Sequence, residues 1–427
     1  MHIFFSGIGG TAIGPLAMIA QQVGHTVSGS DKQDSQYIQY LRSHGFDKIQ
    51  IGQSKDAIQQ IHAKQPIDWY VYSSAVIMEN PNAPELQFCA ENDIKTSKRD
   101  ELLNQIIVDK NLKLIAIAGT HGKTTTTAMA VWLFKQLGLP ISYSVGAKIS
   151  FGEMGQYEDN SEYFVLEADE FDRNFLTFHP FVSLITGVDW DHQEIFPTRA
   201  SYQQAFADFM AQSQQNIIWQ NDVNRIRQAT MTNTLVLDPQ NPDIAQIILI
   251  GGVNRLNAWL VINAIHKLTH RPIAELVDHM NLFPGVNRRF EHLGKHLITD
   301  YAHTVEKIKG CLQTATEVSS EVVVVYEPLT NRRQHYIKDN YKDLFTGVKK
   351  LYWVPSYLAR EESEQIVLTP TDLIAEMNNQ EIAEPAELNN QLKQNIDRHL
   401  QNGDLVVCMS GGGGGGLDEW LRANFAE

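Results

Sequence analysis

The stretch from Leu114 to Thr127, LIAIAGTHGKTTTT, constrains the fold more than any other part of the chain. A short apolar run leads into two glycines, a lysine and four threonines, which predicts a buried strand, a tight turn and the start of a helix. Backbone N–H groups at such a helix N-terminus attract anions, and a lysine and a threonine that follow the turn can hold phosphate and Mg²⁺. The residues predicted to bind the phosphates of a nucleoside triphosphate are Gly119, Thr120, Gly122, Lys123, Thr124 and Thr125.

This loop is shorter than the common pattern G-x-x-x-x-G-K-[ST]. The first glycine of that pattern would fall at Ile117, so the motif here is G-x-x-G-K-T, beginning at Gly119. A glycine turn that merely ends a strand is the alternative. The order of strand, turn, Lys-Thr pair and helix favours the phosphate loop.

Size and charge limit the classes of protein to which the chain can belong. A chain of 427 residues is too long for one ordinary core, and we expect three domains. A net charge of −15 argues against a nucleic-acid partner, and the sequence has no apolar run long enough to span a membrane. The opening MHIFFSGIGG reads as a first strand and not as a signal peptide, so we expect a cytoplasmic protein. Three isolated cysteines argue against a disulfide framework or a thiolate metal site.

The first hundred residues alternate strand and helix in a Rossmann-like pattern. A strand, a glycine turn with Gly9 and Gly10, a helix and a second strand ending in Asp31 predict a site for a diphosphate and a ribose or base. A dinucleotide cofactor is the rival interpretation. A further strand, expected over 68–76, carries Ser73 and Ser74, which either hold a phosphate or form a turn.

Two strands after the phosphate loop end in polar residues. The strand over 163–166 is followed by Glu167, Asp169 and Glu170, and the strand over 182–188 by the sequence DWDH, which ends at His192. The carboxyl ends of parallel strands meet at one sheet edge, so these groups are expected beside the loop. Because oxygen ligands predominate, we expect magnesium and not zinc, held by Thr124, Glu167 and His192.

The remainder of the chain predicts one more α/β domain. Asn254 and Asn257 stand three residues apart at the start of a long helix, where they either contact an adenine edge or serve as helix caps. From about residue 290 strands and helices alternate again, and six glycines at 411–416 predict either a flexible loop or an anion-binding turn. The predicted fold class is therefore α/β in three domains, two of them Rossmann-like around a central phosphate-loop domain with a mostly parallel sheet.

These motifs together resemble the Mur ligases of bacterial cell-wall synthesis over essentially the whole chain. The resemblance rests on GIGGTAIGPLA, SGSD and SSAV, then AGTHGKTTTT, EADEFDRNFL and DWDH, then FPGVNRRFE and DYAH. It implies a UDP-sugar-binding domain at 1–108, in place of a dinucleotide domain, and an ATP-binding domain at 109–286. A C-terminal domain at 287–427 would close over ATP and bind the amino substrate.

Within the family the sequence is similar to the branch that acts on UDP-N-acetylmuramate itself. The resemblance implies that ATP phosphorylates the lactyl carboxylate and that an amine attacks the acyl phosphate to form an amide, with Mg²⁺ as the cofactor. The implied amine is L-alanine. The alternatives are the tripeptide L-Ala-D-Glu-meso-diaminopimelate, as in cell-wall recycling, and a relic without catalysis. A monomer or a homodimer is expected.

The resemblance also assigns roles to residues. It implies that Lys123, His121, Glu167 and His192 are catalytic. ATP is expected to contact the loop and a further set: Asn254, Asn257, Arg289 and Asp300. The UDP-sugar is expected to contact Gly9, Gly10, Thr11, Asp31, Ser73, Ser74, Asp169 and Glu170. The amino substrate is expected to contact His303 and Arg333.

Several positions depart from the family pattern. Thr304 and Val305 stand where the family has a second histidine and a proline, and Thr330 stands where the alanine-specific branch has an arginine. These departures bear on the acceptor amine. No lysine occurs between Lys148 and Lys267, so the carbamylated lysine of other Mur ligases is expected to be absent.

Overall fold

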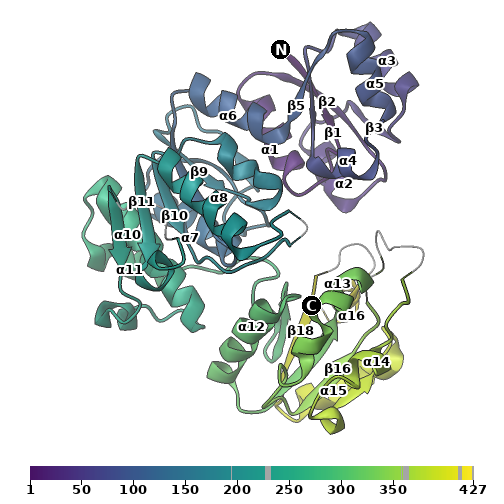
Figure 1. Cartoon of the computed structure of the whole chain (residues 1–427), viewed down its shortest axis with the longest axis vertical. Coiled ribbons are helices and arrows are strands. Elements are labelled where there is room, and N and C mark those ends of the chain that lie inside the picture. The colour runs from purple at the N-terminus through teal and green to yellow at the C-terminus, as the bar shows by residue number, and fades with distance from the viewer. Residues whose placement is uncertain (194, 227–231, 357, 359–364, 412–415, 426–427) are drawn as a thin grey trace. The chain divides into compact units, whose positions relative to one another are not determined.

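The computed structural model describes residues 1–193, 195–226, 232–356, 358, 365–411 and 416–425. Within these residues the strands form three separate sheets, each covered by helices (Figure 1). The chain divides into two compact units, Met1–Ile247 with Leu256–Phe283, and Ile248–Arg255 with Pro284–Glu427. The first unit holds two of the sheets and the second unit holds the third, which confirms the predicted three-domain α/β architecture.

The N-terminal sheet is entirely parallel, in the order β3-β2-β1-β4-β5. Its strands are β1 His2–Ser6, β2 Thr26–Asp31, β3 Ile49–Ile51, β4 Trp69–Tyr72 and β5 Lys95–Lys98. Its helices are α1 Ile13–Gln22, α2 Gln36–Ser43, α3 Lys55–Lys64, α4 Ser74–Glu79, α5 Pro84–Glu91 and α6 Arg99–Asp109. Alternate residues of β1 enter different cores, Ile3 and Phe5 on one face and Phe4 on the other, as expected for a doubly wound sheet. The strand predicted over 68–76 is shorter than expected, because Ser73 is the N-cap of α4.

The central sheet has the order β12-β11-β10-β6-β9-β7-β8, and only β8 is antiparallel to its neighbour. Its strands are β6 Lys113–Ala118, β7 Ser142–Ser144, β8 Gly155–Gln156, β9 Tyr163–Glu167, β10 Val182–Ile185, β11 Gln215–Trp219 and β12 Thr234–Leu237. Its helices and 3₁₀ segments are α7 Lys123–Gln136, η1 Phe171–Thr177, α8 Arg199–Gln212, α9 Gln220–Val223, η2 Pro242–Gln246, α10 Gly252–Thr269 and α11 Ile273–Met280.

The register of this sheet places the predicted site residues together. Strand β6 lies between β9 and β10, with Ile117 opposite Glu167 and Ala118 opposite Ile185. The loop that follows β6 therefore emerges between the segments that carry Glu167 and His192. This arrangement confirms that the three strand ends share one sheet edge.

The N-terminal and central sheets share one core. A single cluster of buried residues includes Leu16 of α1, Ile106 of α6 and Phe164 of β9. Close backbone contact adds to it, since a Cβ on Gly155 would stand 2.5 Å from the Pro15 carbonyl oxygen. The Tyr157 N–H also donates to Gln22 Oε1 at 2.6 Å. These contacts explain why the two sheets form one compact unit.

The C-terminal sheet has the order β13-β14-β18-β15-β16-β17 and is parallel except for β13. Its strands are β13 Glu291–Gly294, β14 Leu297–Asp300, β15 Val322–Glu327, β16 Lys350–Trp353, β17 Ala383–Pro385 and β18 Leu405–Ser410. Its helices and 3₁₀ segments are α12 Val305–Val318, α13 Asn331–Ile337, η3 Lys338–Tyr341, α14 Pro370–Ile374, η4 Gln380–Ile382, α15 Asn390–Gln401 and α16 Leu417–Phe425. Strand β15 is buried along its whole length, which explains its run of four valines.

The six-glycine run precedes α16, and Gly412 to Gly415 lie outside the described residues. The first helical N–H, that of Leu417, donates to both carboxylate oxygens of Glu327 at 3.2 Å. The N-terminus of α16 therefore binds a carboxylate of the chain itself.

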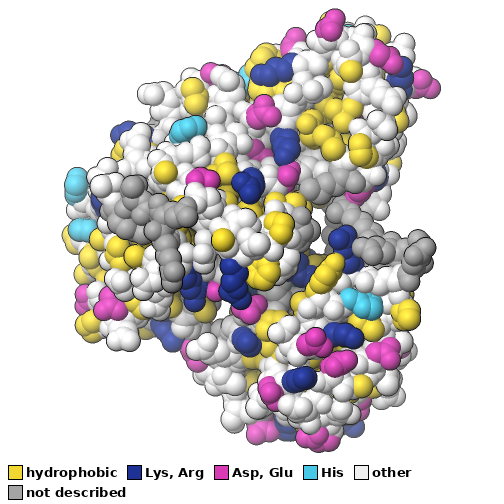
Figure 2. All heavy atoms as spheres, in the orientation of Figure 1, with side chains coloured by type: hydrophobic (Ala, Val, Ile, Leu, Met, Phe, Trp, Pro, Cys, Tyr) yellow, Lys and Arg dark blue, Asp and Glu magenta, His cyan; other side chains and the backbone are white. Residues whose placement is uncertain are grey.

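No helix in the described ranges is long and apolar enough to cross a membrane. Figure 2 shows acidic and basic side chains interspersed over the visible surface of each unit.

Candidate active site

The phosphate loop has the backbone that its glycines permit. Gly119 has φ +144° and Gly122 has φ +81°, conformations that residues with a Cβ rarely adopt. A Cβ on Gly119 would collide with Thr186 Oγ1, and one on Gly122 would stand 2.7 Å from Asn257 Nδ2. Gly122 is the N-cap of α7, so the N–H groups of the first helical turn lie directly after the loop.

Lys123 is turned into the loop. Its Nζ donates to the Gly119 carbonyl oxygen at 2.6 Å and lies 2.9 and 2.7 Å from the two carboxylate oxygens of Glu170. Burial by itself would lower the pKa of Lys123, but the attraction of Glu170 and Asp169 outweighs it and raises the pKa. The ammonium is therefore charged at neutral pH and lies beside the helix N-terminus.

Thr124 and Glu167 form a hydrogen-bonded pair of oxygen-bearing side chains near this ammonium. The Thr124 hydroxyl donates to Glu167 Oε1 at 2.8 Å, and Glu167 Oε2 accepts the Gly146 N–H at 2.9 Å. Mg²⁺ bound to a nucleotide usually takes one or two protein oxygens and completes its shell with phosphate and water. The pair fits that requirement. Among the described residues no group of three or more His, Cys, Asp and Glu side chains is placed to hold a metal by itself.

His192 lies at the same edge, with its backbone in the left-handed region at φ +55°. Its Nε2 is 3.9 Å from Glu170 Oε1, and its ring packs edge-on against Phe171 at 5.1 Å between centroids. His192 therefore lies at the same sheet edge as Glu170, the partner of Lys123.

The loop is also tied to the segment that follows β10. The Thr120 N–H donates to the Gly187 carbonyl oxygen at 2.9 Å, and the Thr186 hydroxyl donates to the His121 carbonyl oxygen. The Thr120 hydroxyl donates to the Asp189 carbonyl oxygen at 2.6 Å and lies 2.8 Å from the Tyr202 hydroxyl. These bonds hold the loop in place through the side chains of Thr120 and Thr186 and through the backbone carbonyl of His121.

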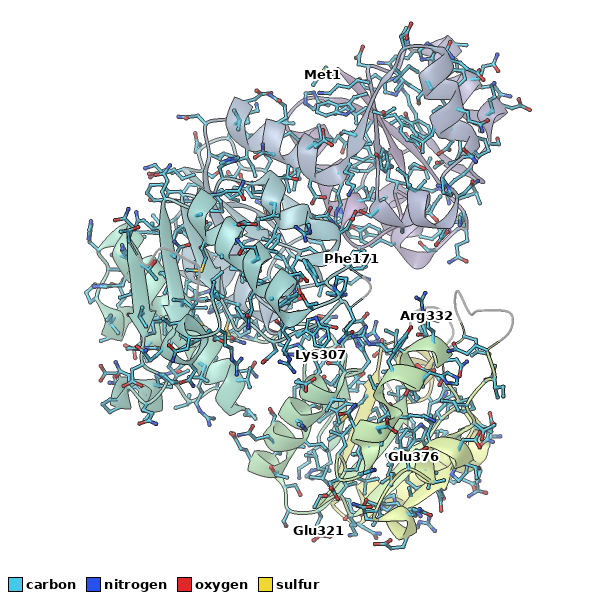
Figure 3. The ribbon with its side chains drawn as sticks, in the orientation of Figure 1. Met1, Phe171, Lys307, Glu321, Arg332 and Glu376 are labelled. Carbon is cyan, nitrogen blue, oxygen red and sulfur yellow. The ribbon has the colours of Figure 1, made fainter. Side chains whose placement is uncertain are left out.

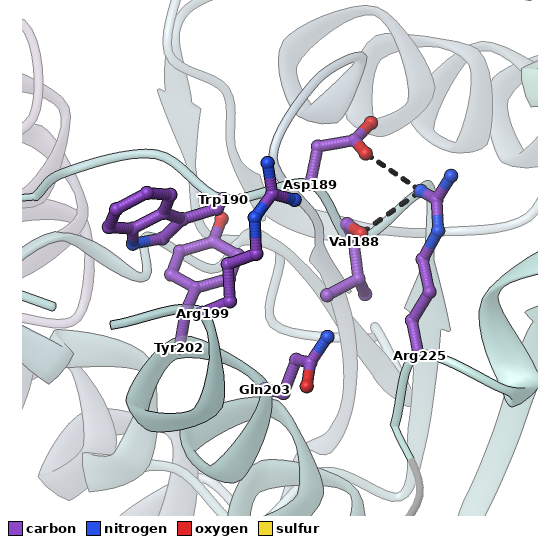
Figure 4. Close-up of a pocket in the computed structure, with 7 residues that line it drawn as sticks. All are labelled: Val188, Asp189, Trp190, Arg199, Tyr202, Gln203 and Arg225. Atoms are coloured by element: carbon purple, nitrogen blue, oxygen red, sulfur yellow. Dashed lines mark hydrogen bonds and ion pairs between the residues drawn. The ribbon is translucent and has the colours of Figure 1, made fainter. Parts of the chain in front are cut away.

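A small polar cavity of about 110 Å³ lies behind this segment (Figure 4). Arg225 closes one side of it by donating to the Val188 carbonyl oxygen at 3.1 Å and to Asp189 Oδ1 at 2.8 Å. The Arg199 guanidinium lies over the Trp190 ring, with 5.5 Å to the centroid. Sequence reasoning did not single out Tyr202 or Arg225, because no motif marks either position.

In the N-terminal domain, Asp31 contacts the glycine turn. Asp31 Oδ2 accepts the Gly9 N–H at 2.8 Å, so this carboxylate holds the turn. Gly10 and Thr11 are exposed at the start of α1, and the Ser73 hydroxyl oxygen would be 3.7 Å from a Cβ on Gly7. The turn and the N-terminus of α4 therefore lie side by side.

The other predicted sugar-site residues join the two domains of the first unit. The Ser74 hydroxyl donates to Asp172 Oδ2 at 2.7 Å, and the same oxygen accepts from Lys98. Asp169 accepts from Arg99 at 3.2 Å. Of the predicted set, Ser74 and Asp169 are thus engaged by protein groups, and Glu170 contacts Lys123. Lys98, Arg99 and Asp172 contact these predicted residues, and the sequence analysis did not name them. The position of Asp172 inside the motif EADEFD was the signal that could have found it.

The predicted residues of the C-terminal domain gather where β14 ends. Asp300 Oδ2 accepts the Phe290 N–H at 2.7 Å, and burial raises the pKa of Asp300 to about 6. The guanidinium of Arg289 lies 5.0 Å from the centroid of the Tyr301 ring, and that ring packs edge-on against His303. Burial lowers the pKa of His303 well below its ordinary value, and Lys307, Arg333 and Arg289 lower it further.

Cationic residues surround this cluster. Lys307 lies in the first turn of α12 and Arg332 in the first turn of α13, and both are at the same end of the domain (Figure 3). Arg333 follows Arg332 on α13. Such a neutral histidine among cations is suited to recognise an anion.

The departures from the family pattern have local structural roles. Thr304 is the N-cap of α12 and accepts the Lys307 N–H at 3.4 Å, while Val305 is buried in the first turn. Thr330 is the N-cap of α13 and accepts the Arg333 N–H at 3.3 Å. Threonine is a favoured N-cap residue, so both positions are compatible with the fold without the usual residues.

The two asparagines of α10 have different environments. Asn254 donates to the Ile250 carbonyl oxygen at 2.8 Å, whereas Asn257 is buried against the backbone of Gly122. Asn257 is therefore beside the phosphate loop. The predicted contact of Asn254 with adenine stays a prediction, as do the other ligand roles.

Comparison with known proteins identifies the family. The family model "Mur ligase family, catalytic domain" matches residues 2–111, and "Mur ligase middle domain" matches residues 117–238. A UDP-N-acetylmuramate–L-alanine ligase of Clostridium beijerinckii is 30% identical over 401 residues, which cover 86% of this chain and 85% of the relative. The chain belongs to the Mur ligase family.

Further relatives agree with this assignment. The enzyme of the same name from Clostridium perfringens is 26% identical over 455 residues, or 96% of this Mur ligase and 95% of the relative. The crystal structure of the UDP-N-acetylmuramate–alanine ligase of Thermotoga maritima has a TM-score of 0.73 and 22% identity, covering 97% of this chain and 96% of that one. A murein peptide ligase of Psychrobacter arcticus has a TM-score of 0.70 and 20% identity, covering 100% and 99%. Both structures share the fold of this Mur ligase.

Proposed function

We propose that this Mur ligase joins the lactyl carboxylate of UDP-N-acetylmuramate to the amino group of L-alanine at the expense of ATP, in peptidoglycan synthesis. The observation that supports this most strongly is the joint placement of Lys123 and the Thr124–Glu167 pair beside the first turn of α7. The chain is also similar over most of its length to relatives named UDP-N-acetylmuramate–L-alanine ligases.

Phosphoryl transfer to a carboxylate brings two anions together, so the site must neutralise charge and align the reactants. The N–H groups of α7 and the Lys123 ammonium supply positive charge where the phosphates are expected. Thr124 and Glu167 would hold Mg²⁺, with His192 as the third candidate ligand. When bound, Mg²⁺ lowers the charge repulsion between the phosphates and the incoming carboxylate.

The second half of the reaction forms the amide. The amine nitrogen attacks the carbonyl carbon of the acyl phosphate, the C–N bond forms, the C–O bond to phosphate breaks, and the amine loses a proton. The proton acceptor is proposed to be His121, Asp169 or Glu170, all of which belong to the segments at this sheet edge. His303 and Arg333 are proposed to bind the carboxylate of the amino acid.

The test is phosphate release from ATP and Mg²⁺ in the presence of UDP-N-acetylmuramate and one acceptor: L-alanine, L-serine, glycine or the tripeptide. We expect turnover with L-alanine, and turnover with the tripeptide alone would contradict the proposed acceptor. Lys123→Ala should abolish turnover and leave UDP-N-acetylmuramate binding within about twofold. Lys135→Ala, in the last turn of the same helix, is the matched control. Loss of UDP-N-acetylmuramate binding in Lys123→Ala alone would refute the separation of the two sites.

A further inference from the structure

Glu170 is a buried carboxylate in contact with the lysine of the phosphate loop. Its side chain is 0% exposed, and both of its oxygens lie within 3 Å of Lys123 Nζ. Lys123 has three protons, and one is donated to the Gly119 carbonyl oxygen. An ammonium that turns to a nucleotide phosphate must therefore loosen its bond to Glu170. A buried carboxylate that loses a charge-assisted bond is destabilised unless another donor replaces it.

Tyr202 is placed to be that donor. It lies in the first turns of α8, is 1% exposed, and packs edge-on against Phe196 and at an angle against Phe206. Its hydroxyl oxygen is 2.8 Å from Thr120 Oγ1 and 3.4 Å from Glu170 Oε1. Figure 4 shows the ring of Tyr202 beside Trp190 and Arg199.

The hydrogen bonds of Thr120 show which proton can move. Thr120 Oγ1 has one proton, which it donates to the Asp189 carbonyl oxygen at 2.6 Å, and it accepts the Asp189 N–H at 2.8 Å. The proton between Thr120 and Tyr202 is then that of Tyr202. Rotation about the C–O bond turns this proton from a neutral acceptor, Thr120, to a charged one, Glu170. Thr120 keeps its two bonds to Asp189 in either arrangement.

We propose that Tyr202 is a positioning residue of the ATP site. Its hydroxyl donates a hydrogen bond to Glu170 when Lys123 leaves that carboxylate for the phosphates of ATP. The exchange keeps the buried carboxylate hydrogen-bonded in both states. It also keeps the carboxylate in place to receive Lys123 again when the nucleotide leaves. This inference rests on the proposed binding of ATP at the loop.

The direct test is Tyr202→Phe, which removes the hydroxyl and keeps the ring contacts with Phe196 and Phe206. A hydrogen bond to a charged group is worth about a tenfold change in affinity or more. We therefore expect ATP to bind about tenfold more weakly, measured by calorimetric titration of the full chain and as the KM for ATP. The kcat at saturating ATP and the KM for UDP-N-acetylmuramate should change less than about twofold.

Tyr143→Phe is the matched control. Tyr143 is a fully buried tyrosine on β7 of the central sheet, and its hydroxyl donates to Gln156 on β8 at 3.0 Å. Both variants lose one buried hydroxyl, and thermal unfolding should show a similar small loss of stability. Only Tyr202→Phe should alter ATP binding.

A second background separates the proposed route from a general effect on packing. If Tyr202 acts through the charge of Glu170, then Tyr202→Phe should have no further effect on ATP affinity in Glu170→Gln. A tenfold loss that persists in Glu170→Gln would overturn the proposal. Equal ATP affinity in Tyr202→Phe and Tyr143→Phe would overturn it as well, while the proposed function stands. Wild-type protein that does not bind ATP would instead refute the proposed function, and the inference with it.

Discussion

Gly122 offers a test of whether the geometry of the phosphate loop matters as the structure indicates. Its φ of +81° costs a residue with a Cβ about 1–2 kcal/mol. A Cβ there would also stand 2.7 Å from Nδ2 and 3.1 Å from Oδ1 of Asn257, which is 3% exposed and has little room to move. In Gly122→Ala the loop and the first turn of α7 must shift. A displacement of reacting groups by about 1 Å can reduce turnover by about a hundredfold.

Gly138→Ala is the matched control, because it imposes the backbone strain without the collision. Gly138 follows the C-terminal end of the same helix, has φ +64°, and has no atom within 4 Å of a Cβ. Chemical denaturation should show a loss of about 1–2 kcal/mol in this variant, with unchanged kinetics. Gly122→Ala should lose at least as much stability, and phosphate release should fall at least tenfold. Equal kinetics in the two variants would refute the argument that Asn257 and Gly122 fix the loop.

Two further predictions concern the C-terminal domain. Burial raises the pKa of Asp300 from 3.8 to about 6, so its contribution to stability is fully present below pH 3.8 and is lost as the pH rises through about 6. Asp300→Asn keeps an acceptor for the Phe290 N–H. Between pH 4 and pH 7, chemical denaturation should show that the free energy of unfolding of this variant depends less on pH than that of wild type. An identical dependence would contradict the assignment. Arg333→Ala should raise the KM for L-alanine about tenfold and leave the KM for ATP unchanged. Arg332 is its exposed neighbour, and Arg332→Ala should change neither KM. Equal effects of the two variants would argue against a specific role of Arg333.

The sequence predicted the central sheet edge because the succession of strands along the chain and the turn chemistry after each strand are local signals. An apolar run before GTHGKT indicates a strand, a turn and a helix, and parallel strands bring Glu167 and His192 to the same edge as the loop. The three α/β domains follow from the same alternation of strand and helix. The end of the strand at Tyr72 was predicted less well, because an N-cap serine and a strand residue share the extended backbone conformation.

The partners of individual side chains were less predictable. Asp169 and Glu170 are adjacent in the sequence, yet Asp169 accepts from Arg99 and Glu170 from Lys123. Thr304 and Thr330, which appear as losses in the sequence, are helix caps in the structure. Such roles depend on which segments pack together and are not encoded in any one motif.

The sequence by itself determined the phosphate loop, the alternation of strands and helices, and the set of acidic groups at the sheet edge, because each is specified by neighbours along the chain. Only the tertiary structure decided that Tyr202 reaches both Thr120 and Glu170, that Asp172 joins Ser74 and Lys98, and that Asn257 lies against Gly122. These contacts join residues 32 to 135 positions apart in the chain. The packing of separate elements selects them, and the physical reason is that a buried polar group must find its partner wherever the fold places one.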